Sequence, residues 1–135
     1  MPFASWNDSY SVKVLRLDDE HKQLFSIINQ LHEGMKAGQG RDVMQDVLDQ
    51  LLHYTEEHFR DEEALMQVVR YPWLVAHTGL HQRFVNKIRG FSKDFHSGAA
   101  PISVDMLEFL RNWLAKHILG VDHQYGTALS TAGIR

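Results

Sequence analysis

The chain of 135 residues is long enough for one domain with a real hydrophobic core, and its 44% hydrophobic and 23% charged residues are ordinary for a globular protein. A formal net charge of −3, with acidic and basic residues interspersed, argues against a surface that binds nucleic acid or anionic membranes. Cysteine is absent, which excludes disulfides, thiolate metal sites and cysteine nucleophiles.

The sequence carries no sign of targeting to or through a membrane. No apolar run approaches the roughly 20 residues that span a bilayer, and the N-terminus lacks the basic and apolar regions of a signal peptide. We therefore expect a cytoplasmic protein. The unusual feature of the composition is nine histidines in so short a chain.

The first half of the chain predicts an arm and two helices. Residues 1–17 show no helical period and are expected to form an N-terminal arm. A helix over about 19–37 follows, with acidic residues at its start, where the helix dipole favours them. Gly38 and Gly40 separate it from a second helix over about 41–69. One face of this second helix is apolar but also holds a histidine and a glutamate: Leu48, Leu51, Thr55, His58, Glu62, Leu65 and Met66.

The second half predicts two more helices and a tail. Pro72 suits the first turn of a helix over about 72–95, and Ser103 suits the N-cap of a helix over about 103–119. Gly120 can end that last helix, so residues 120–135 are expected to form a short tail. Short connections imply antiparallel neighbours. The prediction is a single all-α domain, an up-down-up-down antiparallel four-helix bundle.

This topology gathers chemically similar side chains from distant parts of the chain. The start of the first helix, the end of the second, the start of the third and the end of the fourth all lie at one end of such a bundle. Two pairs four residues apart share helix faces, His58 with Glu62 and His77 with His81. The complete set expected at this end is His21, His58, Glu62, His77, His81, His117 and Asp122.

Asp122 fits this set only under a condition. It follows His117 by five residues, which on a regular helix of 3.6 residues per turn turns it about 140° away. Both side chains can face one site if the helix ends or loosens between them, and Gly120 permits this.

Five imidazoles and two carboxylates directed into a core indicate a metal site, because such groups are costly to bury alone. They are too many for one four-coordinate zinc and suit two octahedral ions bridged by the carboxylates. Imidazole ligands favour iron, copper, nickel or zinc over magnesium or calcium. Neutral ligands stabilise high-valent iron poorly, which favours binding O₂ over cleaving it. The remaining histidines are interpreted as packing, surface or loop residues: His32, His53, His96 and His123.

The motifs resemble those of the bacteriohemerythrins, single-domain members of the hemerythrin family. The matching segments follow the family order and spacing across nearly the whole chain: Asp19-Glu20-His21, His58-Phe59-x-x-Glu62-Glu63, His77-x-x-x-His81 and Trp113-x-x-x-His117-Ile118-x-x-x-Asp122. The resemblance implies two non-heme iron ions joined by an oxo or hydroxo bridge. It assigns His77, His81 and His117 to one iron, His21 and His58 to the other, and Glu62 and Asp122 to both as bridges.

The same resemblance implies reversible O₂ binding, for carriage, storage or delivery, rather than enzyme activity. The O₂ pocket is expected to have apolar walls that exclude water: Phe25, Phe59, Leu114 and Ile118. We expect O₂ as the ligand, an oxygen-consuming enzyme as a candidate recipient, a monomer, and no nucleic-acid or membrane partner. The alternatives are oxygen or redox sensing, an enzyme acting on peroxide or nitric oxide, and iron handling.

Overall fold

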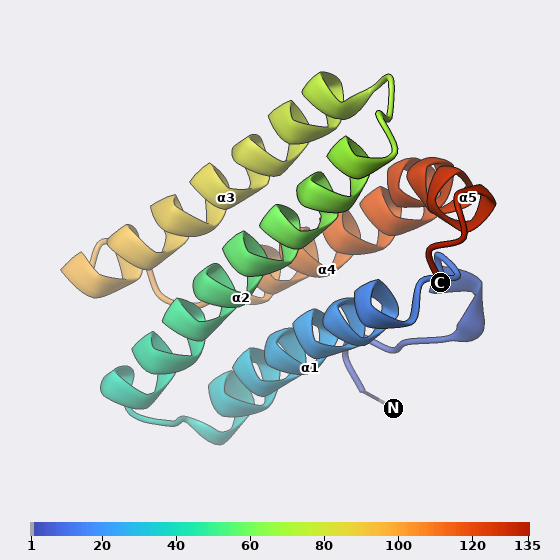
Figure 1. Cartoon of the computed structure of the whole chain (residues 1–135). Helices are drawn as coiled ribbons and strands as arrows, with labels where there is room; N and C mark the ends of the chain where they lie inside the picture. Colours follow the sequence, from blue (N-terminus) through green and yellow to red (C-terminus); the bar gives the residue numbers. More distant parts are fainter. Residues whose placement is uncertain (1) are drawn as a thin grey trace.

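Four long antiparallel helices form the body of the molecule in the computed structural model, which describes residues 2–135 (Figure 1). They are α1 (Leu15–Ala37), α2 (Arg41–Val68), α3 (Leu74–Ser97) and α4 (Val104–Lys116). A π-helical turn, η2 (His117–Asp122), continues α4 into a short fifth helix, α5 (His123–Thr131). A 3-10 turn, η1 (Asp8–Tyr10), lies in the N-terminal arm. The predicted all-α, up-down-up-down bundle is confirmed.

Leucine and isoleucine fill the space between the helices. The side chains with at most 1% of their surface exposed include the following core residues: Leu17, Leu24, Ile28, Leu31, Leu48, Leu51, Ile88, Leu107 and Leu110. Successive members of this set on one helix are three, four or seven residues apart, which is the spacing of an amphipathic helix. Within residues 2–135, no helix combines the length and the apolar character that crossing a bilayer requires.

Local signals set most helix ends. Gly38 and Gly98 end α1 and α3 in the left-handed conformation, with φ of +67° and +82°, which glycine adopts without steric cost. The Ser103 hydroxyl accepts a hydrogen bond from the Met106 N–H at 3.2 Å and caps α4. Pro72 was expected inside the first turn of α3, but it lies in the turn before Leu74, so that helix runs from Leu74 to Ser97.

The expected arm over residues 1–17 was too long. α1 begins at Leu15, with Val14 as its N-cap, because the helix ladder already starts at the hydrogen bond from Asp18 N–H to Val14 C=O. The Asp18 carboxylate does not serve the helix dipole alone. It accepts hydrogen bonds from the Val12 N–H at 2.8 Å and the Ser11 hydroxyl at 2.6 Å and so fixes the arm against α1.

The expected tail over residues 120–135 was wrong for most of its length. The helix does not end at Gly120 but widens there into a π-helical turn and continues as α5. α5 lies at the end of the bundle where α2 turns into α3 (Figure 1). α5 carries two fully buried side chains, Tyr125 and Leu129, and packs against α2. It therefore closes one end of the core.

Candidate metal centre

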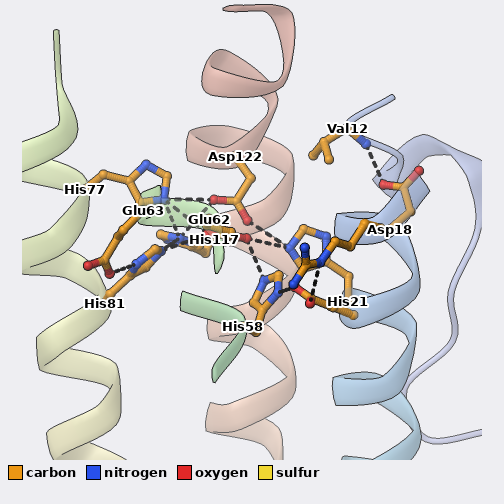
Figure 2. Close-up of polar contacts among 12 residues, drawn as sticks. Val12, Asp18, His21, His58, Glu62, Glu63, His77, His81, His117 and Asp122 are labelled. Atoms are coloured by element: carbon orange, nitrogen blue, oxygen red, sulfur yellow. Dashed lines mark hydrogen bonds and ion pairs between the residues drawn. The ribbon is translucent and has the colours of Figure 1, made fainter. Parts of the chain in front are cut away.

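Seven buried polar side chains converge at the end of the bundle that α5 closes (Figure 2). They come from α1, α2, α3 and η2, and none exposes more than 5% of its surface: His21, His58, Glu62, His77, His81, His117 and Asp122. These are the residues that the topology was expected to bring together. The structure brings all seven together within two overlapping groups.

The first group has five members and the second has three. The ligand atoms of Glu62, His77, His81, His117 and Asp122 all lie within 4.8 Å of one another. A second set with the same spacing joins His21 and His58 to Glu62. Since Glu62 belongs to both groups, the arrangement has the form of two adjoining cation sites with a shared carboxylate.

Three imidazole nitrogens in the first group face one another across a small space. The Nε2 atom of His117 lies 3.2 Å from the Nε2 atoms of both His77 and His81. Metal–nitrogen bonds of about 2.1 Å at right angles place neighbouring ligand atoms about 3 Å apart. The two distances from His117 Nε2 fit nitrogens at neighbouring positions around one six-coordinate ion.

Each carboxylate contacts both groups. Glu62 Oε1 lies 2.6 Å from His58 Nε2 and 2.9 Å from His21 Nε2, whereas Glu62 Oε2 lies 3.1 Å from His81 Nε2. Asp122 Oδ1 lies 3.0 Å from His77 Nε2, and its Oδ2 lies 3.3 Å from His21 Nε2. In both carboxylates, one oxygen faces the first group and the other oxygen faces the second group. This is the geometry of a bridging ligand.

The π-helical turn explains how Asp122 reaches the site. Hydrogen bonds in a π-helix join residues five apart, so side chains with that spacing come close to the same face. Asp122 Oδ1 accordingly lies 3.1 Å from His117 Nε2. The loosening that the spacing required is present, as a widened helix rather than a helix end.

Two further carboxylates hold histidines of the cluster from outside. Glu20 Oε1 lies 2.7 Å from His58 Nδ1, and Glu63 Oε2 lies 2.8 Å from His81 Nδ1. Each contact favours the tautomer that carries its proton on Nδ1 and leaves Nε2 free to bind a cation. The sequence analysis included Glu20 and Glu63 in the motifs that resemble the family but assigned neither of them a role at the site. The signal available in the sequence was that each is next to a candidate ligand, Glu20 to His21 and Glu63 to Glu62.

The buried charges shift one another's pKa values strongly. Burial lowers the pKa of His58, but the charge of Glu62, whose Oε1 lies 2.6 Å from His58 Nε2, and a hydrogen bond to Glu20 outweigh it and raise this pKa to about 10. The pKa of His21 is raised as well, because its contacts with the two inner carboxylates outweigh burial and the charge of His58. The pKa of Glu62 and that of Asp122 are lowered despite burial, because the neighbouring histidines stabilise the ionised carboxylates.

The donor set fits two divalent cations. With neutral imidazoles the seven side chains carry two negative charges in a buried site, which is costly without compensation. Four ligand atoms make no hydrogen bond within residues 2–135: His58 Nε2, Glu62 Oε2, Asp122 Oδ1 and Asp122 Oδ2. Native proteins rarely leave so many buried polar atoms together without a partner. Cations in the two groups would satisfy all four.

Aromatic and aliphatic side chains surround the polar cluster. The Phe59 ring stacks on His81 with centroids 3.6 Å apart, and Trp113 stacks on His117 at 4.4 Å. Leu114 and Ile118, on either side of His117 in sequence, are both buried. Phe25 is buried on α1 with its ring against the arm residues Trp6 and Tyr10.

The four histidines left out of the predicted site also lie outside both groups. His32 stacks on Phe3 of the arm at a centroid distance of 4.3 Å. His53 and His96 are exposed, and His123 is half-buried at the start of α5.

Comparisons with known proteins also point to a cation-binding domain. A family model described as Hemerythrin HHE cation binding domain matches residues 13–129. A bacteriohemerythrin of Methylococcus capsulatus is 34% identical over 131 residues, which cover 96% of this chain and 99% of that protein. A myohemerythrin of Theromyzon tessulatum is 31% identical over 120 residues, covering 89% of this chain and 88% of that protein.

Solved structures agree over nearly the full length. A wild-type hemerythrin matches with a TM-score of 0.88 at 35% identity, covering 95% of this chain and 98% of that one. A point mutant of hemerythrin matches with a TM-score of 0.91 at 34% identity, covering 96% and 99%. With the family model and both relatives in accord, this chain belongs to the hemerythrin family.

Proposed function

We propose that this protein binds O₂ reversibly at a non-heme di-iron centre. The single observation that carries the proposal is the pair of adjoining ligand groups, rich in imidazole and spanned by two carboxylates. Relatives that cover nearly the whole chain are named bacteriohemerythrin and myohemerythrin, which supports the same function.

The ligand groups differ in the number of histidines, and this difference gives the two ions different roles. His77, His81 and His117 would hold one iron together with Glu62 and Asp122. His21 and His58 would hold the other iron with the same two carboxylates, so this ion would take one protein ligand fewer and could accept O₂. The bound irons would supply the electrons that O₂ takes up on binding and returns on release.

The chain's own residues keep the negative charge of the ligands low and the site dry. Five of the seven ligands are imidazoles, which add less negative charge than carboxylates and so favour binding of O₂ over cleavage of its bond. We propose that Leu114, Ile118, Phe25 and Phe59 form the apolar walls that exclude water from the open position. Excluding water slows oxidation of the irons to an inert state.

Glu20 and Glu63 act on the ligands rather than on the ions. By holding the Nδ1 proton of His58 and His81, they orient each ring and keep Nε2 directed into the site. The site is therefore built before metal binds, which lowers the cost of ordering it.

Carriage, storage or delivery of O₂ follows from such a site, with an oxygen-consuming enzyme as the recipient. An oxygen-uptake measurement tests this function against enzyme activity. Reduced, iron-loaded protein should take up one O₂ for each pair of irons and release it when the solution is purged. Continued consumption of O₂, or turnover of peroxide or nitric oxide faster than the protein oxidises itself, would contradict it.

A further inference from the structure

Tyr125 is a buried polar residue to which the ligand set assigns no role. Its side chain on α5 is completely buried, and its hydroxyl makes no hydrogen bond within residues 2–135. A phenolic O–H can both donate and accept, and leaving it buried without a partner is unfavourable. The position of this hydroxyl therefore calls for an acceptor.

The phenol lies beside the metal centre. Its ring meets the ring of His77 edge-on, with centroids 5.3 Å apart. Burial, followed by the charges of Glu62 and Asp122, raises the pKa of Tyr125 well above its usual value. The phenol thus remains an O–H donor at any ordinary pH. Glu62 Oε2 lies 3.8 Å from Nε2 of His77, the ring against which the phenol packs.

The backbone holds Tyr125 firmly in this place. It follows Asp122 by three residues on a continuous helical segment, so both side chains face the same way. The next residue, Gly126, lies so close to the arm that a Cβ there would be 2.7 Å from the Val12 carbonyl oxygen. This contact seats α5 directly on the arm and limits movement of the phenol.

We propose that Tyr125 is a positioning residue that donates a hydrogen bond from its hydroxyl to the bridging carboxylate of Glu62 when metal is bound. The inference rests on the proposed di-iron function and extends it by one residue beyond the ligands. Glu62 Oε2 has no hydrogen-bond partner within residues 2–135, so the donor and the acceptor each lack a partner. Holding the shared carboxylate in place stabilises both cation sites together.

The test compares Tyr125→Phe with Tyr71→Phe. Phenylalanine keeps the ring against His77 and removes only the hydroxyl. Tyr71 is the matched control because it is also buried, 6% exposed, and packs on Tyr125 at a centroid distance of 6.4 Å. Each protein is loaded with ferrous iron without oxygen, and transfer of iron to a chelator is followed over time. Thermal unfolding of each metal-free protein is measured in parallel.

We expect Tyr125→Phe to release iron about 10- to 100-fold faster than wild type, the usual effect of losing a partner of a metal ligand. Tyr71→Phe should release it at the wild-type rate. Metal-free Tyr125→Phe should be at least as stable as wild type, because the lost hydroxyl had no partner there.

Three results would overturn the proposal: wild-type iron release from Tyr125→Phe, equal acceleration by Tyr71→Phe, or a metal-free Tyr125→Phe that unfolds at a clearly lower temperature. If wild type holds two irons and binds O₂ reversibly while Tyr125→Phe behaves identically, only the role of Tyr125 fails. If wild type holds no iron, the proposed function fails with it.

Discussion

His117 and Asp122 face the same cluster although they are five positions apart in the sequence, because this segment is a π-helix. Asp122 Oδ1 lies 3.1 Å from His117 Nε2, and Asp122 Oδ2 lies 3.3 Å from His21 Nε2 on the opposite helix. A regular α-helix would turn the carboxylate away from the site. The widened turn is thus a structural requirement for the proposed role of Asp122 as the second bridge.

Removing that bridge should weaken binding of both ions. We expect Asp122→Ala to accelerate iron release to a chelator by at least about 100-fold, since partners outside the ligand shell already contribute 10- to 100-fold. The metal-free variant should remain helical by circular dichroism, because the apolar core is unchanged. Glu108→Ala, at an exposed position on α4, is the control and should behave as wild type. Equal iron retention by Asp122→Ala and wild type would remove Asp122 from the ligand set.

Loss of an outer carboxylate, Glu20 or Glu63, should weaken metal binding less than loss of Asp122. Glu20→Gln and Glu63→Gln each replace a charged partner of a histidine Nδ1 with a neutral one. Each should lower metal affinity about 10- to 100-fold in a competition titration. Glu57→Gln, an exposed residue of α2 paired with exposed His53, should leave the affinity unchanged. If all three variants titrate alike, the outer contacts do not tune the site.

The raised pKa of His58 predicts opposite pH trends for the metal-free and the metal-loaded protein. In the folded metal-free protein this pKa is about 10, against an ordinary value of 6.5. Its contribution to stability is complete below pH 6.5 and is lost as the pH rises through 10. Metal binding must displace the proton, so metal affinity should rise over the same interval. Thermal unfolding and metal titration at pH 6.5, 8 and 10 check both trends; a metal-free protein equally stable at all three would contradict the first.

Glycine substitutions test how α5 is seated. Gly126→Ala places a Cβ 2.7 Å from the Val12 carbonyl oxygen, so the arm and α5 must separate. We expect a loss of about 1–3 kcal/mol in the free energy of unfolding, typical of overpacking. Gly79→Ala, in α3 where a Cβ meets nothing within 4 Å, should instead add about 0.5–1 kcal/mol. Denaturant unfolding of both variants gives the comparison, and equal shifts would show that the arm does not press on Gly126.

The bundle and the convergence of the seven side chains could be predicted because both follow from repeated patterns. Apolar spacing marks helices, and short connections fix their antiparallel order. Residues four apart, such as His77 and His81, share one face of a helix. The spacing also showed that Asp122 could join only if the helix loosened. It did not show how, because propensities do not distinguish a π-helical turn from a helix end at Gly120.

The missed features depend on tertiary contacts. Residues 123–131 form α5 because Tyr125 and Leu129 bury their side chains against the bundle, a gain that local sequence does not show. Glu20 lies in an acidic run, and only the distance to His58 Nδ1 distinguishes it from its neighbours. The position of Tyr125 against His77 could not be predicted without the path of η2.

The most direct test of the central claim is the visible absorption spectrum of reduced, iron-loaded protein, recorded without oxygen, then with it, then after purging. Reversible O₂ binding predicts a colourless form that colours on oxygenation and bleaches when oxygen is removed. Colour that persists after purging, or iron-loaded protein that never colours, would contradict reversible O₂ binding at this site.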